Sequence, residues 1–561
     1  EMLKGLCFWS GLGTVAVLLV GCSGESDSTG IVAGFDSGAA DSSSVDAAET
    51  GTTDSSSTDA ADSGVGDSSS TDAADSGAAD STADSHDSSV ADSSSVDAAD
   101  SSVADSLAFD ASDANSVDSS TADSTISDSS AGDSSDASDL KGVYYVATDG
   151  SDQNPGTISK PFLTLKKGFG ALAAGETLLI RGGIYALQRV DVTTSGTAAA
   201  YKSVRNYPGE EVVFDGQNST SSSTNGVSVK FAGVSYWNIS GITMKNWIAA
   251  GIYLSNASHI NISDMVIRDI NNPYEASVNP YGSEGIMGEG SSYITVADTT
   301  IFNVGVASPA SRRAAHVDHG VYFGYESHHW TFNYDRFYDT IGCGIQSYAG
   351  ESHNSDGGSY TTVSNSLFYN NAMSGVLLSD NTQSYIVNNT FFGNGQNDLE
   401  FYSHATNVSV YNNIFGSKFS SGSFHIWWKD STSQGNVIDY NAYRVASQSV
   451  YYNGTSYGFA GWTGMGYESH GVSGDPAFLN ESSGDFRVHG SSNTLGMASA
   501  SYAPRFDYVH HLRQVSGQDI GAYDYNDAHD NYEGYSPSSY TISGGTWAID
   551  SGKSYTQSDG S

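Results

Sequence analysis

The chain has 561 residues, with 64 Asp and Glu against 22 Lys and Arg, a formal net charge of −42 and three cysteines. Nucleic acid is excluded as a partner, because the sequence holds no cluster of basic residues that could bind phosphates. A disulfide-stabilised scaffold is excluded as well, because Cys7, Cys22 and Cys343 are too few to build one.

Residues 2–22 have the layout of a secretory signal, with Lys4 near the start, an apolar run, and a small residue before Cys22. The ending Leu-Val-Gly-Cys resembles a lipoprotein signal-peptide box, which implies cleavage before Cys22 and lipid on its sulfur. We therefore expect a secreted protein, lipid-anchored at the bacterial outer membrane or cell surface. The alternative is a transmembrane anchor, although the apolar run is short for a hydrocarbon core of ~30 Å.

Residues 23–140 repeat Asp, Ser, Ala, Thr and Gly, and include 27 of the acidic residues without any Lys or Arg. Such a segment cannot bury enough apolar surface to offset its ordering entropy, and repulsion between the aspartates extends it. We expect a disordered linker that acts as a tether. Calcium binding by the aspartates is the alternative, but the repeat lacks the glycine turn and fixed carboxylate spacing of a calcium loop.

From residue 141 the composition shifts to aromatic, β-branched, Asn and Gly residues. A strand is expected at 144–147, then a short amphipathic helix that opens at Pro161 and carries Leu165 and Phe169, then strands at 177–180 and 211–214. This helix would cap one end of a stack of strands whose edges would otherwise be exposed.

Seven repeats follow, each with an apolar residue that usually comes after a glycine, and with a spacing in the low twenties where no loop intervenes. The apolar positions are Ile252, Ile286, Val321, Ile345, Val376, Leu399 and Ile426. A second set of small polar residues precedes them at Ser240, Ser263, Asp298, Asp335, Asn365, Asn389 and Asn413. We expect coils stacked ~4.8 Å apart, with the apolar column inside and the polar column at a recurring bend.

The opening YYVATDGSDQNPGT, the segment GETLLIRGGIY, the NNTFF and NNIF bends, and the closing GDPAFLNESSGDFRV resemble the right-handed parallel β-helix proteins of the pectate-lyase-like superfamily. The resemblance covers about residues 143–525. It implies an all-β right-handed parallel β-helix over residues 141–525. The superfamily holds polysaccharide lyases, glycoside hydrolases and proteins of unknown activity, so the resemblance is specific for fold rather than for activity.

Strand alternation predicts that the residue after each inward apolar position points outward, as does the residue two further on. This outward wall offers aromatic rings that pack on sugars and polar groups that bond hydroxyls, and we expect it to bind substrate. An alternative is that long loops cover this face and make the aromatics a second core. The expected substrate-binding residues are Tyr253, Glu289, Tyr322, Gln346, Tyr348, Glu400, Tyr402, Trp427 and Lys429.

The densest polar cluster is Arg312, Arg313, His316, Asp318 and His319. His319 is the expected general base or acid, since imidazole titrates near neutral pH. Asp318 or His316 would orient it, and Arg313 would neutralise a uronate carboxylate. The alternative is a hydrogen-bonded loop anchor without a catalytic role.

Two other chemistries, hydrolysis by a pair of carboxylates and catalysis at a metal site, have weaker support in the sequence than β-elimination. Glu289 and Glu400 would lie ~19 Å apart if four coils separate them, which is too far for a glycosidase pair; Glu284 with Glu289 remains a weaker pairing. His316, Asp318 and His319 could ligate zinc but do not make a closed site. Calcium is implied by the resemblance to pectate lyases, although the clustered aspartates and strand-borne lysine of the family 9 enzymes cannot be placed here.

Cys343, between two glycines, is expected to be buried.

Residues 526–561 are expected to form a linker and the start of a truncated jelly-roll module, with Trp547 on a strand; a frayed tail is the alternative. The sequence as a whole predicts a monomeric, surface-anchored protein that binds an extracellular acidic polysaccharide and cleaves it by β-elimination. The alternatives are a non-catalytic glycan-binding or adhesion protein and a glycoside hydrolase.

Overall fold

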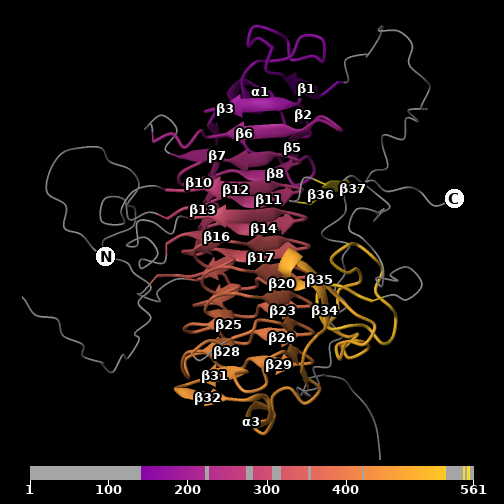
Figure 1. The fold of residues 1–561 in the computed structure, drawn as a ribbon. Helices are drawn as coiled ribbons and strands as arrows, with labels where there is room; N and C mark the ends of the chain where they lie inside the picture. The colour runs from indigo at the N-terminus through magenta and orange to yellow at the C-terminus, as the bar shows by residue number, and fades with distance from the viewer. Residues whose placement is uncertain are drawn as a thin grey trace, which may run out of the picture. The chain divides into compact units, whose positions relative to one another are not determined.

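The computed structural model describes residues 141–525 except 221–225, 273–281, 306–316, 351–355 and 420–421, together with the backbone of 547–549 and 553–555. Within this part of the chain, three long sheets run side by side along a stack of coils, and successive coils pair in parallel (Figure 1). From β2 to β31, each coil contributes one strand to each sheet. The expected parallel β-helix is confirmed.

The three sheets each contain eleven of the described strands. Sheet I comprises β1 (Val143–Val146), β2 (Thr177–Ile180), β5 (Lys202–Asn206), β8 (Ser235–Ser240), β11 (Ser258–Ser263), β14 (Ser292–Ala297), β17 (His328–Asn333), β20 (Thr362–Ser364), β23 (Tyr385–Val387), β26 (Ser409–Tyr411) and β29 (Val437–Asp439). Sheet II comprises β4 (Val190–Val192), β7 (Val227–Ala232), β10 (Ala250–Ser255), β13 (Glu284–Glu289), β16 (His319–Gly324), β19 (Ile345–Ser347), β22 (Val376–Leu378), β25 (Asn397–Phe401), β28 (Phe424–Trp428), β31 (Val450–Tyr452) and β32 (Thr455–Tyr457). Sheet III comprises β3 (Gly183–Ala186), β6 (Val212–Asp215), β9 (Thr243–Lys245), β12 (Val266–Ile270), β15 (Thr300–Val304), β18 (Arg336–Tyr338), β21 (Leu367–Tyr369), β24 (Thr390–Phe392), β27 (Ile414–Phe415), β30 (Ala442–Tyr443) and β33 (Val472–Ser473).

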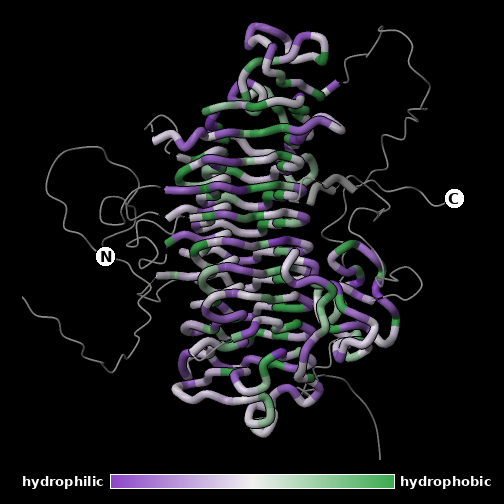
Figure 2. The backbone as a smooth tube through the Cα atoms, viewed as in Figure 1, coloured by the Kyte–Doolittle hydropathy of each residue, from purple (hydrophilic) through white to green (hydrophobic). Residues whose placement is uncertain are grey.

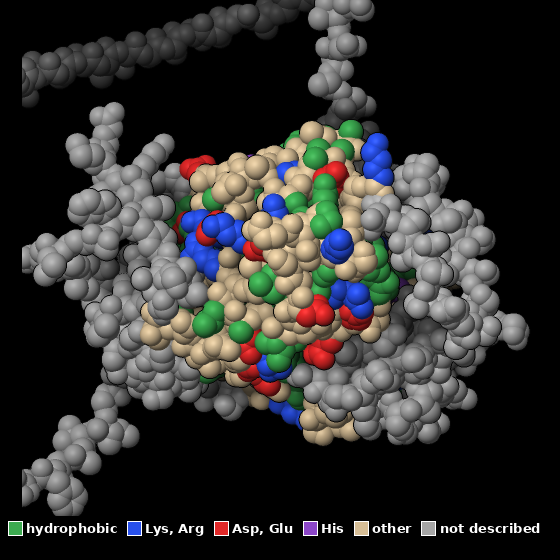
Figure 3. All heavy atoms as spheres, turned by 90° about the horizontal axis from the view of Figure 1, so that it is seen from above, with side chains coloured by type: hydrophobic (Ala, Val, Ile, Leu, Met, Phe, Trp, Pro, Cys, Tyr) green, Lys and Arg blue, Asp and Glu red, His purple; other side chains and the backbone are tan. Residues whose placement is uncertain are grey.

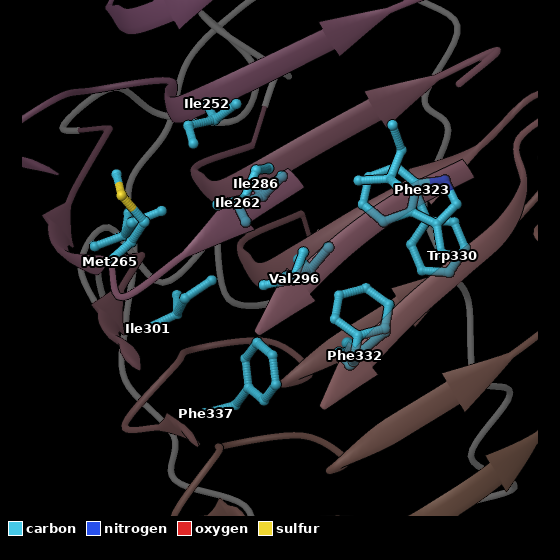
Figure 4. Packing of buried hydrophobic residues seen from close by; sticks show 14 of the residues in the cluster. Ile252, Ile262, Met265, Ile286, Val296, Ile301, Phe323, Trp330, Phe332 and Phe337 are labelled. Carbon is cyan, nitrogen blue, oxygen red and sulfur yellow. The ribbon is translucent and has the colours of Figure 1, made fainter. Parts of the chain in front are cut away.

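The inward apolar column of sheet II has the register that the sequence predicts. The aligned residues are Ile252, Ile286, Val321, Ile345, Val376, Leu399 and Ile426. All seven side chains are fully buried. They pack against inward side chains of the other two sheets, such as Ile262 and Ile301 (Figure 4). Hydrophobic and hydrophilic residues alternate along the coils, as a wall with one buried face requires (Figure 2).

The glycines before this column have a packing function. A methyl group on Gly251 would lie 2.7 Å from Ile267 Cγ2, and one on Gly285 would lie 2.5 Å from Ile301 Cγ2. Both isoleucines belong to sheet III, so the missing side chain lets the core of sheet III approach the start of each sheet II strand. The glycine in the repeat is therefore explained by close packing rather than by a turn.

The register that the sequence predicts for the polar column at the bend is partly wrong. Asp335, Asn389 and Asn413 do lie in one buried column, directly before the strands of sheet III. Asp298 and Asn365 lie one residue earlier, at positions with φ of 52° and 45°. Ser240 and Ser263 end β8 and β11, one residue earlier still. The bend thus uses two adjacent positions, of which the first is left-handed, and the sequence pattern merged the two into one.

The N-terminal end of the stack carries α1 (Leu165–Ala171), close to the expected position. The Thr164 side chain accepts a hydrogen bond from the Lys167 N–H and begins the helix. Phe169 is buried and its ring stacks on Trp237 at 6.0 Å, so the helix covers the core at this end. Among the described residues drawn in Figure 3, basic and acidic side chains lie intermixed at this end, without an extended field of one sign.

The opposite end carries α3 (Phe459–Thr463), whose Trp462 is fully buried and stacks on Tyr467 at 4.0 Å. The chain then returns along sheet III through β34 (Phe478–Asn480), the 3-10 turn Glu481–Ser483 and β35 (Asp485–Val488). This segment lies beside the lower coils in Figure 1, and Phe486 packs there on Tyr369 and Phe392. The outer face of sheet III around β21 and β24 is therefore occupied by the chain's own residues.

The segment 505–525 is fixed by Arg513, whose side chain is buried. Its guanidinium donates to Asn365 Oδ1 and to the carbonyls of Gly521 and Ala522. Farther on, β36 (Trp547–Ile549) and β37 (Lys553–Tyr555) form an antiparallel pair; the rest of 526–561 lies outside the described residues, and the jelly-roll module stays a prediction. No helix of the described part is long and apolar enough to cross a membrane. Residues 1–140, with the expected signal, Cys22 and linker, lie outside the described residues.

Candidate functional site on the outer face of sheet II

The outward residues of sheet II align along one wall. The column directly after the inward one is Tyr253, Met287, Tyr322, Gln346, Leu377, Glu400 and Trp427, in the register that the sequence predicts. Lys230 precedes it on β7 and Tyr451 follows it on β31. The wall has three parts along its length, which differ in exposure and polarity.

The N-terminal part of the wall is half-exposed and polar. The Tyr253 hydroxyl donates to Glu289 Oε2 at 2.5 Å, and Lys230 Nζ lies 4.5 Å from the centroid of the Tyr253 ring. The three side chains come from the consecutive coils β7, β10 and β13. Tyr322 is also half-exposed, one coil beyond Glu289. A cation, an aromatic ring and a carboxylate therefore face solvent together.

The middle part of the wall is closed, and the expectation that it faces solvent is wrong. Gln346, Tyr348 and Glu400 are only 1%, 3% and 5% exposed. Leu377 packs with Cys343 and Met373 in a small cluster outside the main core, and this makes part of the face a second core. Cys343 is buried, as the sequence predicts.

Glu400 is held in this closed part by the Ser374 hydroxyl and by Asn397 Nδ2, the latter at 2.7 Å. Burial raises the pKa of the Glu400 carboxyl, and the hydrogen bonds from Ser374 and Asn397 oppose that rise only in part. Strand order places four coil steps between β13 and β25, so Glu289 and Glu400 lie about 19 Å apart. This separation does not fit a hydrolytic pair of carboxylates.

The C-terminal part of the wall is aromatic and half-exposed. The rings of Trp427 and Tyr451 stack at 5.8 Å and 8°, and Tyr402 lies 6.2 Å from Trp427. Lys429 Nζ lies 3.7 Å from the centroid of the Tyr402 ring. This part repeats the pairing of lysine and tyrosine seen at the other end.

The expected catalytic residues lie at the start of β16, beside the wall. His319 and Asp318 are each 1% exposed, and the His319 ring stacks on Tyr322 at 5.9 Å. Asp318 Oδ1 accepts the backbone N–H of Ser283 at 2.8 Å. Arg313 and His316 lie outside the described residues, as does Arg312. Their roles, and the catalytic role of His319, stay predictions.

One hydrogen bond of His319 sets the tautomer of its neutral ring. Its Nδ1 accepts the backbone N–H of Cys343 at 3.0 Å, so a neutral ring carries its proton on Nε2. In that tautomer Nε2 is a hydrogen-bond donor and cannot take up a proton. The geometry therefore supports hydrogen-bond donation by His319 through Nε2 and does not support its action as a general base.

The sequence analysis missed Lys230 and Tyr451. Both extend the outward column by one coil, and the segments around them have the same alternation as the seven repeats. Extending the register of the inward column to Val229 and Val450 would have identified them.

Within the ranges given above, no three His, Cys, Asp or Glu side chains come close enough to share a metal ion. Calcium, whose ligands also include backbone and amide oxygens, stays a prediction.

Two curated relatives align with short parts of the chain. An uncharacterised protein, YwoF of Bacillus subtilis, is 38% identical over 134 residues, which are 22% of this chain and 28% of that protein. Pectate lyase PEL9 of Emericella nidulans is 40% identical over 74 residues, which are 13% and 18% of the two chains. The chain thus spans less than a third of either relative.

Solved structures with a similar fold are more distant in sequence. Pectate lyase Pel9A has a TM-score of 0.48 at 16% identity, over 69% of this chain and 99% of that one. An alginate lyase from Paenibacillus sp. FPU-7 has a TM-score of 0.39 at 19% identity, over 52% and 94%. The model of the Pel9A-like right-handed β-helix region matches residues 144–444, more than half of the chain. The chain belongs to the Pel9A-like right-handed β-helix family.

Proposed function

We propose that this protein binds an extracellular acidic polysaccharide along the outer face of sheet II and cleaves it by β-elimination. Lipid on Cys22 would hold it at the bacterial outer membrane or cell surface, at the end of the linker 23–140. The observation that carries the proposal is the half-exposed group of Lys230, Tyr253 and Glu289, aligned with Tyr322 on one wall.

The chemistry of this wall suits a sugar polymer. Aromatic rings contact the apolar faces and edges of sugars, carboxylates accept hydrogen bonds from hydroxyls, and ammonium groups pair with uronate carboxylates. A polymer lying along the stack would meet a new side chain about every 4.8 Å. The family name, and the pectate lyase that shares a short segment with this chain, support a carbohydrate substrate.

β-Elimination needs three groups from the protein: one that neutralises the uronate carboxylate, one that removes the proton from C5, and one that protonates the leaving oxygen at C4. Arg313 remains the proposed neutralising group. The Nε2–H of His319 suits a hydrogen bond to the leaving oxygen, and the proton that this oxygen takes up is not assigned to a described side chain. No described side chain is assigned as the base.

Binding without cleavage is the second candidate. It is favoured by the burial of His319 and Asp318. Each side chain accepts a hydrogen bond from a backbone N–H, which is a structural role. In that case the wall would act as an adhesion surface.

The test uses the full chain with pectate, alginate and a neutral glycan, each with and without added calcium. Ultraviolet absorbance from an unsaturated product would identify a lyase, and new reducing ends without that absorbance would identify a hydrolase. Binding without either product, unchanged in His319→Ala, would establish the second candidate. Absence of binding to all three polymers would contradict both.

A further inference from the structure

A partly exposed column of aromatic rings runs along sheet I, beside the start of its strands. One ring comes from each of five successive coils, in the order Tyr236, His259, Tyr293, His329 and Tyr360. Neighbouring rings pack on one another with centroids 4.6–4.8 Å apart. All five residues have a left-handed backbone, with φ between 55° and 67°. The His329 ring is therefore held in place between two tyrosine rings.

The residue before each ring is a serine in four of these coils and a histidine in one. His328 lies in register with Ser235, Ser258, Ser292 and Ser359. Side chains that are adjacent along a strand normally point to opposite faces, but the left-handed φ of His329 interrupts that alternation. His328 and His329 are both half-exposed, and Trp330 is the first residue of this strand to be fully buried. Two imidazoles thus lie side by side on the surface.

The two imidazoles meet through the same atom. His328 Nδ1 lies 2.7 Å from His329 Nδ1, and the ring planes cross at 79°. In this hydrogen bond one Nδ1–H donates to the lone pair of the other Nδ1. Two nitrogens that each bind one metal ion at ~2.0–2.1 Å lie about 2.9–3.4 Å apart, depending on the angle at the metal. The rings need to turn and to part by less than about 1 Å for both lone pairs to reach one ion. The donor ring then carries its proton on Nε2, so that no net proton is lost.

We propose that His328 and His329 chelate one divalent transition-metal ion through their two Nδ1 atoms. Imidazole nitrogen suits Zn²⁺, Ni²⁺ and Cu²⁺, whereas Ca²⁺ and Mg²⁺ prefer oxygen ligands. No third His, Cys, Asp or Glu side chain among the described residues joins the pair, so water completes the coordination. The site belongs to sheet I and does not depend on polysaccharide binding or cleavage at sheet II.

The experiment titrates the full chain with Ni²⁺ by calorimetry, in excess Ca²⁺ that occupies carboxylate oxygens. Two variants replace each histidine by the residue that the adjacent coils have at that position, namely His328→Ser and His329→Tyr. Each variant should bind one equivalent of Ni²⁺ less than the parent chain. Each should also lose the rise in unfolding temperature that Ni²⁺ gives the parent chain through this site. Thermal unfolding without metal checks that the variants fold like the parent chain, and if His329→Tyr does not, His328→Ser alone decides.

His259→Tyr is the matched control, because it makes the same ring replacement in a coil where Ser258 stands in place of the second imidazole. It should bind Ni²⁺ like the parent chain. Equal Ni²⁺ binding by His328→Ser and the parent chain would overturn the site and leave a plain hydrogen bond between two imidazoles. A loss of the same size in His259→Tyr would also overturn it, because the effect would then belong to the column of rings. A parent chain that binds no Ni²⁺ would overturn the site and leave the proposed function untouched.

Discussion

Asn441 donates two hydrogen bonds to the carboxyl group of Glu468, from its backbone N–H at 3.0 Å and from its side-chain Nδ2 at 2.8 Å. The same two donors of Asn413 bind Asn441 Oδ1, and those of Asn389 bind Asn413 Oδ1. Each side-chain amide in this ladder is buried, so each must find partners within the protein. Glu468 accepts the last bonds and ends the ladder.

The first prediction concerns Glu468 and pH. Burial raises the pKa of its carboxyl from 4.5 to about 8, although Tyr443, Asn441 and the Asn441 N–H donate to it. The folded protein therefore holds a proton that the unfolded chain releases above pH 4.5. The free energy of unfolding should fall as pH rises from about 4.5 to 8, by at most about 1.4 kcal/mol per pH unit from this group.

Glu468→Gln removes the titrating group and keeps one acceptor oxygen. Urea unfolding of both proteins across this pH range should show a difference in stability that shrinks with rising pH. A difference that stays constant from pH 4.5 to 8 would contradict a raised pKa at Glu468.

The second prediction concerns the glycine column. A methyl group on Gly375 would lie 2.6 Å from Phe391 Cδ1 and 2.8 Å from the Asp398 carbonyl oxygen. Gly375→Ala should therefore destabilise the fold by about 1–3 kcal/mol through overpacking. Thermal unfolding measures this directly.

Gly170 is the matched control, since it lies in α1 and no described atom comes within 4 Å of where its methyl group would stand. Gly170→Ala should stabilise the fold by about 0.5–1 kcal/mol, because alanine restricts the unfolded chain and favours a helix. Effects of the same sign and size in both variants would show that the glycine column is not set by packing against sheet III.

The inward column could be predicted from the sequence because one physical rule, burial of every second side chain, fixes it in each coil. The bend could not be assigned so simply. In the pairs Asn388-Asn389 and Asn412-Asn413 both members are buried and only the first is left-handed, so identical residue types do not show which of them starts the bend. Closure of the middle of the wall depends on Cys343 packing against Met373 and Leu377 of the next coil, a tertiary contact that strand alternation alone does not encode.

The third prediction concerns a buried hydrogen bond between His425 and Asp398. His425 Nδ1 lies 2.8 Å from Asp398 Oδ2, both side chains are fully buried, and His425 Nε2 accepts the Val445 N–H. Asp398→Ala leaves the imidazole N–H, Asn394 Nδ2 and the Ser417 hydroxyl without this acceptor in the core, and should cost about 3–5 kcal/mol of unfolding free energy.

His470 and Asp439 provide the surface counterpart, since the same atoms lie at the same 2.8 Å but the His470 side chain is 55% exposed. His470→Ala should cost less than about 1 kcal/mol. Denaturant unfolding compares the two variants. A small loss in Asp398→Ala would mean that water or another group replaces the carboxylate in the core.

The fourth prediction tests whether a polymer reaches both open parts of the wall. Trp427 lies six coil steps from Tyr253, about 29 Å along the stack. A polysaccharide can touch both residues, whereas a disaccharide bound beside Tyr253 cannot. Trp427→Ala should lower affinity for the polymer several-fold through loss of aromatic contact, and leave affinity for the disaccharide unchanged.

Tyr293 is the control for loss of an exposed ring, because it is 47% exposed and lies on sheet I rather than on this wall. Tyr293→Ala should bind both ligands like the parent chain in the same calorimetric titration. Equal losses for polymer and disaccharide in Trp427→Ala would indicate that the substitution perturbs the wall as a whole. Unchanged polymer affinity would exclude Trp427 from the binding surface and confine the polymer to the part of the wall around Lys230, Tyr253 and Glu289, since the middle of the wall is closed to solvent.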